Sequence, residues 1–312
     1  MAKNQKEHKT SIGGSAVMEG VMMRGPEKMA VAVRKSDGEI VMDLKDVKPP
    51  KKRMWLWRLP VIRGCINFFE SMVTSVKALM FSADCMDIEE EKPSKFDKWL
   101  EKVFGEKLKT VVIYFAVILS VLMSVGLFIL LPTGLVSLIG MLTENRVVLS
   151  ASEGVIRILI FLGYLIIVSF MPDIKRVFQY HGAEHKTIAC YEAGEPLTVE
   201  NARTKCRLHP RCGTSFLLIV MVISIIAFSF LSWDKLWIRM VTRLALMPVV
   251  AGVSYEIIKF AGRHDNWFTK ILSWPGKMLQ KITTKEPDDS QLEVAIASME
   301  AVIPENQDEA KW

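Results

Sequence analysis

Two stretches of this chain, 111–131 and 214–233, contain no charged residue. Each is about twenty residues long, which is the length that a helix needs to cross the hydrocarbon core of a bilayer. Neither stretch offers the polar face that a helix on the surface of a soluble protein requires. The mean hydropathy of the whole chain is also positive, at +0.25. The sequence therefore predicts a membrane protein with at least two spanning helices.

Two further stretches are apolar but interrupted. Residues 154–171 are apolar except for Arg157, which lies near the start and can extend its guanidinium to the interface. Residues 236–260 contain an apolar stretch, so they form either a polar-lined span or a re-entrant segment; the interrupting residues are Arg239, Arg243, Pro248 and Glu256. We predict a mainly α fold, a polytopic membrane helix bundle of about four spans.

The distribution of cations predicts the orientation of these spans. Lys and Arg are frequent in 92–109, in the loop 172–213 and after the fourth stretch, whereas the loop 132–153 has only Arg146. Because cytoplasmic loops are enriched in Lys and Arg, both termini and the loop 172–213 are expected in the cytoplasm. No cleavable signal peptide is visible near the N-terminus. We expect a multi-pass protein of the cytoplasmic membrane.

Four regions are expected along the chain. Residues 1–53 form a small cytoplasmic β-unit with a Gly- and Met-rich segment, because two β-prone runs flank Asp37-Gly38, a hairpin signal. Residues 54–110 hold an amphipathic interfacial helix over 60–84, anchored by Trp55 and Trp57, and a linker. Residues 111–260 form the bundle and include the cytoplasmic loop 172–213. Residues 261–312 are a cytoplasmic segment with a short helix, indicated by the spacing of apolar residues from Leu292 to Ile303.

The loop 172–213 contains an H-x-x-E-H motif formed by His181, Glu184 and His185. On a helix, the two histidines lie one turn apart on one face and can bind one metal ion. Glu184 and Glu192 fall on a similar face and can reach the same site, whereas Cys190 points to the opposite side. The alternative is an interfacial helix whose His and Glu side chains are only solvated.

Further donors follow directly before the third span. His209 and Cys212 are expected as the third and fourth ligands, and Arg211 is placed to stabilise negative charge on a substrate. Otherwise, His209 is a turn residue before a proline and Cys212 a small buried side chain. Cys206 is a weaker candidate. Imidazole and thiolate together favour zinc, although donor types alone leave ferrous iron and manganese open. With a free coordination position the site is catalytic, with Glu184 as general base; with four protein ligands it is structural.

The segment 13–26 is rich in glycine and methionine and contains Glu19 and Arg24. Such glycines allow the backbone to approach another surface closely. We expect either a loop that covers the metal site, with both side chains as accessory groups, or the entry to a hairpin with a structural Glu–Arg pair. His264 is expected to be interfacial and not catalytic.

At these residues the sequence resembles the YqhQ-like family of uncharacterised bacterial membrane proteins, which have been described as predicted metal-dependent enzymes. The resemblance rests on four blocks that span nearly the whole chain: GGSAVMEGVMMRGP at 13–26, YHGAEHKTI at 180–188, HPRCGTSF at 209–216 and TTKEPDDSQLEVAIA at 283–297. It implies a multi-span protein with a metal site at His181, Glu184, His185, His209 and Cys212. It supplies no substrate.

Three functions are compatible with these features. The first is a zinc-dependent hydrolase that acts at the cytoplasmic face on a membrane-associated substrate. The second is a non-catalytic membrane scaffold, in which a structural metal site orders the loop for a protein partner. The third is a metal or ion transporter, suggested by the polar fourth stretch, which would require homo-oligomers. The net charge of +6 indicates orientation in the bilayer and not nucleic-acid binding.

Overall fold

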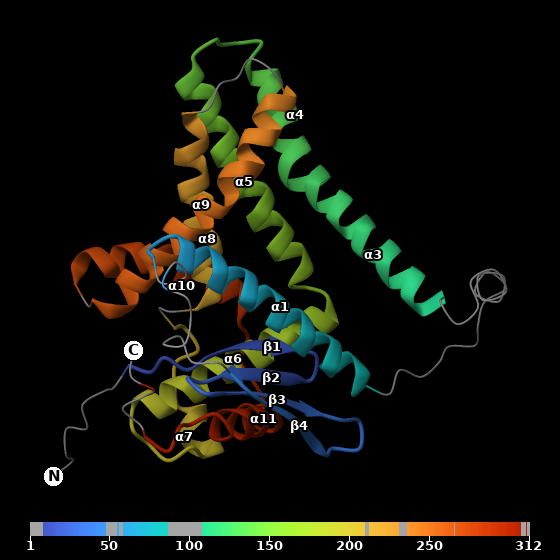
Figure 1. Cartoon of the computed structure of the whole chain (residues 1–312), viewed down its shortest axis with the longest axis vertical. Helices are drawn as coiled ribbons and strands as arrows, with labels where there is room; N and C mark the ends of the chain where they lie inside the picture. Colours follow the sequence, from blue (N-terminus) through green and yellow to red (C-terminus); the bar gives the residue numbers. More distant parts are fainter. Residues whose placement is uncertain are drawn as a thin grey trace. The chain divides into compact units, whose positions relative to one another are not determined.

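We analysed a computed structural model of the chain, which describes residues 9–47, 55, 59–86, 108–209, 212–230, 236–264, 266–306 and 310. The protein divides into two compact units. The first joins residues 1–86 to residues 165–312, and the second comprises residues 87–164. Figure 1 shows the elements of both units along the sequence. The first unit holds the candidate site.

The N-terminal segment folds into a four-stranded antiparallel sheet in the order β1-β2-β3-β4. The strands are β1 (Gly13–Val17), β2 (Gly20–Arg24), β3 (Lys28–Arg34) and β4 (Ile40–Asp46). The predicted hairpin across Asp37-Gly38 is confirmed, with Lys35 N–H donating to the Glu39 carbonyl at 2.9 Å. The glycine-rich segment forms the β1–β2 hairpin, so of the two expectations for it the hairpin is correct and the loop is wrong.

Both faces of the sheet are covered by helices. Side chains such as Val21 and Met23 pack against α6 (Pro172–Glu192) and α11 (Asp289–Glu300). Their neighbours, such as Val17 and Met22, pack on the opposite face with α1 (Ile62–Asp84). Figure 1 shows the sheet between these two helical layers. An antiparallel sheet buried on both faces explains why β2 and β3 read as continuous apolar runs.

The core between the sheet and α11 contains Leu292, which is fully buried. We expect Leu292→Ala to destabilise the protein by about 2–5 kcal/mol, because the substitution loses apolar contacts and leaves a cavity. Thermal or denaturant unfolding of the purified protein measures this change. The matched substitution Leu44→Ala, at a side chain that is half exposed on β4, is expected to change stability by about 0.5 kcal/mol or less. Equal losses in both variants would contradict the described core.

The amphipathic helix predicted for 60–84 is confirmed as α1, and two charged residues of its polar side face the protein, whereas Lys77 is exposed. Arg63 pairs with Glu256, and Glu70 lies 3.8 Å from Arg24. The exposed side is apolar and includes Phe69, Met72, Val73, Val76 and Met80. Trp55 is exposed, whereas Trp57 lies outside the described residues. A helix that directs apolar residues outward and polar residues inward is typical of contact with lipid and not with water.

Three helical segments in the described part of the chain are long and apolar enough to cross a membrane: Ile118–Ile139, Val147–Val168 and Val241–Arg263. The first combines α3 (Leu108–Val125), a π-helical turn (Gly126–Leu130) and α4 (Leu131–Ile139), whereas the other two lie in α5 (Arg146–Val168) and α9 (Leu236–Arg263). The expected third span is the shorter apolar helix α8 (Gly213–Ser229). Over the described residues, three helices are thus long and apolar enough to span a membrane, where about four spans were predicted.

The remaining helices are α7 (Val199–Arg203) and α10 (Trp267–Thr283). The short helix expected in the C-terminal segment is confirmed as α11, whereas α10 was not anticipated. Asn266 caps α10 by accepting a hydrogen bond from Thr269 N–H at 2.9 Å, and the Thr269 hydroxyl accepts one from Asn266 N–H. The end of α10 reaches the candidate site, because its last residues contact the histidines.

Candidate metal centre

The two histidines of the motif lie on α6, which begins and ends at clear signals. Pro172 occupies the first turn after extended Met171, and the helix continues to Glu192. Because α5 ends at Val168 and Met171 is extended, α6 is a separate helix and not a continuation of α5. Nearly every residue from Tyr180 to Tyr191 is buried, since this half of α6 packs against the sheet and α11.

His181 and His185 converge with Cys212. The ring centroids of the two histidines are 4.5 Å apart, and His181 Nε2 lies 3.2 Å from Cys212 Sγ. One ligand atom from each of the three residues lies within 4.8 Å of the other two. The one-turn spacing on α6 therefore brings both imidazoles to one point, and Cys212, directly before α8, completes a group of three donors.

Each of these imidazoles is anchored by its other ring nitrogen. His181 Nδ1 lies 2.9 Å from the carbonyl oxygen of Thr283, and His185 Nδ1 contacts the carbonyl oxygen of Arg207. A carbonyl only accepts, so both Nδ1 atoms carry the proton in these contacts. Each Nε2 is then left as the nitrogen that can bind a metal ion once it carries no proton. Metal-binding histidines are held in this way in proteins, with one nitrogen on the metal and the other donating to a carbonyl.

Charge interactions are strong within this buried group. Burial by itself lowers the pKa of His181, but the nearby Cys212 sulfur outweighs it and raises that pKa to about 9. Burial by itself raises the pKa of Cys212, but the two imidazoles outweigh it and hold that pKa well below its usual range. Cys212 also caps α8, with Sγ 3.4 Å from Thr214 N–H. These shifts favour the imidazolium form of His181 and the thiolate form of Cys212. Thiolate is the form of cysteine that binds metals.

Glu184 lies beside the three donors and is buried. Burial raises the pKa of its carboxyl group, and the two histidines only partly oppose this shift. Its Oε2 has no hydrogen-bond partner in the described part of the chain. Gly14 of β1 approaches so closely that a Cβ atom there would lie 3.0 Å from Glu184 Cδ. The glycine-rich segment therefore contacts Glu184 through a strand of the hairpin, which was the second of the two expectations for it.

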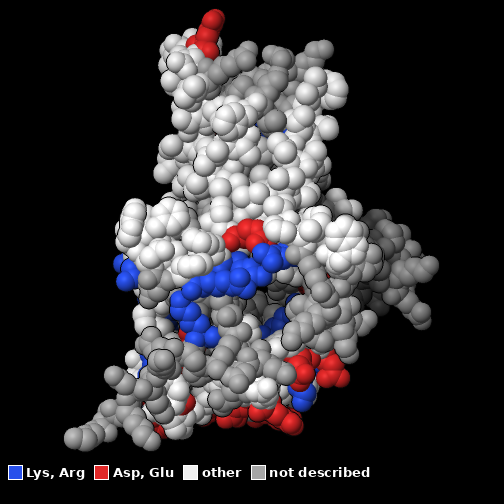
Figure 2. Space-filling view, turned by 60° about the vertical axis from the view of Figure 1, so that its left-hand side comes forward, with Lys and Arg blue, Asp and Glu red and all other residues white. Residues whose placement is uncertain are grey.

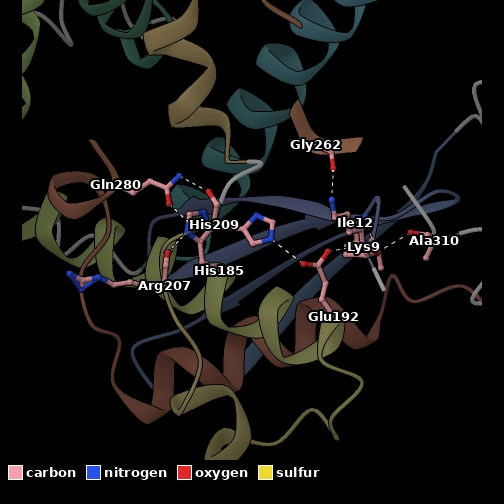
Figure 3. A network of polar contacts seen from close by, with 10 residues as sticks. Lys9, Ile12, His185, Glu192, Arg207, His209, Gly262, Gln280 and Ala310 are labelled. Carbon is pink, nitrogen blue, oxygen red and sulfur yellow. Dashed lines mark hydrogen bonds and ion pairs between the residues drawn. The ribbon is translucent and has the colours of Figure 1, made fainter. Parts of the chain in front are cut away.

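His209 occupies a neighbouring position but belongs to another network. Its Nε2 lies 3.2 Å from Glu192 Oε2, and Glu192 Oε1 accepts a hydrogen bond from Thr10 N–H at 2.7 Å. Gln280 of α10 clamps the backbone of His209, accepting from its N–H at 2.8 Å and donating to its carbonyl at 2.7 Å. Figure 3 shows this network with His185 and His209 side by side and Glu192 directed toward His209. Neither His209 nor Glu192 belongs to the group of three donors.

The other candidate residues lie in several places. Glu19 pairs with Arg176 and contacts the Tyr180 hydroxyl at 3.2 Å, so it does not form the expected pair with Arg24. Arg211 lies outside the described residues. Three side chains considered earlier stand apart from the cluster: Cys190, which contacts the Pro196 carbonyl at 3.5 Å; Cys206, which is exposed; and His264, which is exposed and stacked on Phe260.

The sequence interpretation missed the contributions of α10 and the segment after it. Thr283 supplies the carbonyl that orients His181, and Gln280 holds the backbone of His209. No metal-ligand pattern marks either residue, because one acts through its backbone and the other through a neutral amide. The only available signal was the amphipathic spacing of Trp267, Ile271 and Trp274, which predicts a helix but not its contact with the histidines.

Comparison with known proteins places the chain among proteins without an assigned activity. Residues 59–305 match the family described as "Protein of unknown function (DUF1385)". The chain is also 36% identical over 304 residues to the "Uncharacterized protein YqhQ" of Bacillus subtilis (strain 168), an alignment that covers 95% of both proteins. No solved structure matches the chain.

Proposed function

We propose that this chain, which belongs to the DUF1385 family of proteins of unknown function, is a metal-dependent hydrolase. His181, His185 and Cys212 would hold the ion, and zinc is the metal that this donor set suits best. The observation that carries the proposal is the convergence of the two imidazoles and the thiolate, with both Nδ1 atoms anchored to backbone carbonyls. A solvated interfacial helix would not bury and orient its histidines in this way.

The number of donors supports a catalytic site. Catalytic zinc sites typically have three protein ligands and one open position, whereas structural sites have four. The structural alternative needs His209 as a fourth ligand, and the contact of His209 with Glu192 favours the site of three. Buried Glu184 interacts electrostatically with all three donors, and its unpartnered Oε2 has capacity to accept a proton or a hydrogen bond.

Glu184 would act as the general base. Because its pKa is raised, this carboxylate binds a proton more readily than an ordinary glutamate does. This suits a base that must take a proton from water and later return it. A zinc ion would supply Lewis acidity, which lowers the pKa of water to about 7. The close contact with Gly14 and the anchored rings of His181 and His185 would hold these groups in place and exclude bulk water.

We further propose that the enzyme acts at the cytoplasmic face of the cytoplasmic membrane on a membrane-associated substrate. The three candidate spans and the apolar exposed side of α1 support contact with a bilayer. Figure 2 shows Lys and Arg side chains gathered in a band on one face, with a hollow beside the band. Cations near the ends of spans favour a cytoplasmic location.

The test is the substitution Glu184→Gln in the full chain, purified in lipid nanodiscs and loaded with zinc. We expect hydrolysis of a panel of ester, phosphoester and peptide substrates to fall by about 10²–10⁴-fold, the usual contribution of a general base. The zinc content should stay unchanged, because Glu184 is not among the three ligands.

Glu200→Gln, at an exposed carboxylate of α7, is the matched control and should keep full activity. Unchanged hydrolysis by the metal-loaded Glu184→Gln protein would overturn the proposed role of Glu184. Wild-type protein that binds zinc in a closed shell of four protein ligands and hydrolyses nothing would favour the scaffold function instead.

A further inference from the structure

A basic pocket lies on the other side of the segment that holds His185. It has a volume of about 370 Å³ and is lined by Lys186, Lys205, Cys206, Arg207, Leu208, Lys281 and Glu286. Two of these residues link it directly to the candidate centre. Lys186 follows His185 in the chain, and the backbone carbonyl of Arg207 anchors the His185 ring. The pocket and the metal-ligand cluster therefore share a wall.

The lining of this pocket carries more positive than negative charge. Four cations, Lys186, Lys205, Arg207 and Lys281, face one carboxylate, that of Glu286. Glu286 pairs with Lys186 and lies 3.5 Å from Arg207, so one negative charge is shared between two cations. Glu195, which does not line the pocket, pairs with Lys205. Lys281 has no ion pair in the described ranges of the chain.

Two of the cations are suited to holding an anion in a fixed place. The side chain of Lys186 is only 5% exposed, and its Nζ also donates to the Arg203 carbonyl at 2.8 Å, so its charge is held in position. Arg207 offers a planar guanidinium, which matches the paired oxygens of phosphate or carboxylate. Lysines next to arginine are common in phosphate sites, where they act as point charges. A dianionic group would balance this excess of charge better than a monoanion.

The helix that supplies Lys281 also supplies an apolar surface. Trp267, Ile271 and Trp274 are exposed on α10 at helical spacing, and Lys281 falls within about 40° of Trp267 around the same helix. Tryptophan is enriched where proteins meet the interface of a bilayer. One stripe of α10 thus runs from a surface suited to lipid to the rim of the basic pocket.

From this geometry we infer that the pocket binds a phosphate group, and that the group belongs to a phosphomonoester lipid. The volume is large enough for a headgroup as well as the phosphate, and the stripe on α10 gives the attached chains an apolar surface. If this lipid is the substrate, the inference rests on the proposed hydrolase and names its substrate class. Phosphate binding itself requires only the pocket.

Phosphate binding is tested with the full chain in phosphatidylcholine nanodiscs. One arm titrates inorganic phosphate by calorimetry, and the other measures retention of phosphatidic acid from nanodiscs that contain it. Arg207→Gln and Lys281→Gln should each weaken binding by about tenfold or more, because each removes a charge-assisted contact. Lys277→Gln, which removes the same charge from α10 outside the pocket lining, should leave binding unchanged.

The two arms distinguish the sources of the phosphate. Retention of phosphatidic acid that depends on Arg207 and Lys281 supports the lipid, whereas dependence seen only with inorganic phosphate overturns the lipid assignment. Equal binding by wild type, Arg207→Gln and Lys281→Gln in both arms overturns the pocket as a phosphate site. Repeating the titrations with the double variant His181→Ala/His185→Ala separates the proposals, because phosphate binding should survive there even if metal and hydrolysis are lost.

Discussion

Replacing His185 with alanine is expected to abolish the proposed zinc binding of the purified protein. The substitution removes one of three converging donors, and the two that remain, His181 and Cys212, cannot close a stable site for zinc. Loss of an outer hydrogen-bond partner alone typically costs about 10–100-fold in metal affinity, so the loss of a ligand should cost more than about 100-fold. Elemental analysis of protein purified without a histidine tag measures the change from one ion per chain to almost none.

Because His185 is buried, its removal also affects packing, and a second variant is needed. Cys212→Asp keeps an anionic donor at the start of α8 and should retain a metal site of weaker affinity. His264→Ala, at an exposed histidine away from the cluster, should bind zinc like the wild type. Full zinc occupancy in folded His185→Ala protein would contradict the assignment of this ligand, whatever the outcome for activity.

Local patterns in the sequence were sufficient to predict several elements correctly. The i, i+4 spacing of His181 and His185 predicted two rings on one face of a helix, and the rings lie 4.5 Å apart. The Asp37-Gly38 signal predicted the β3–β4 hairpin, and the apolar spacing after Leu292 predicted α11. In each case residues within a few positions of one another determine the local structure, so a short sequence pattern is enough to predict it.

The contacts that complete the site join residues far apart in the chain, and no local pattern encodes them. Thr283 anchors His181 through a backbone carbonyl, which any residue type could supply. His209 was an expected ligand, but Glu192 is a competing partner for its ring and Gln280 fixes its backbone. Donor types near one another in the sequence therefore predicted the three donors that lie together, His181, His185 and Cys212, but not that His209 has another partner.

The same long-range packing makes Gly182 of α6 a sensitive position outside the ligands. A Cβ atom at Gly182 would lie 2.0 Å from the carbonyl oxygen of Lys285, a distance that no side-chain rotation can relieve because the clashing atom is in the backbone. The segment after α10 would have to move away from α6. Since Thr283 in that segment anchors His181, the displacement should loosen the metal-ligand cluster as well as the fold.

We therefore expect Gly182→Ala to destabilise the protein by at least about 1–3 kcal/mol, the usual cost of overpacking a core, and to weaken zinc binding at the same time. Thermal unfolding with and without added zinc measures both effects, because zinc bound to the folded state raises the unfolding temperature. Gly163→Ala is the matched control: a Cβ atom there meets nothing within 4 Å, and alanine favours a helix more than glycine does. A Gly182→Ala protein with wild-type stability and zinc affinity would contradict the close packing of α6 against the segment that follows α10, because that packing leaves no space for a methyl group.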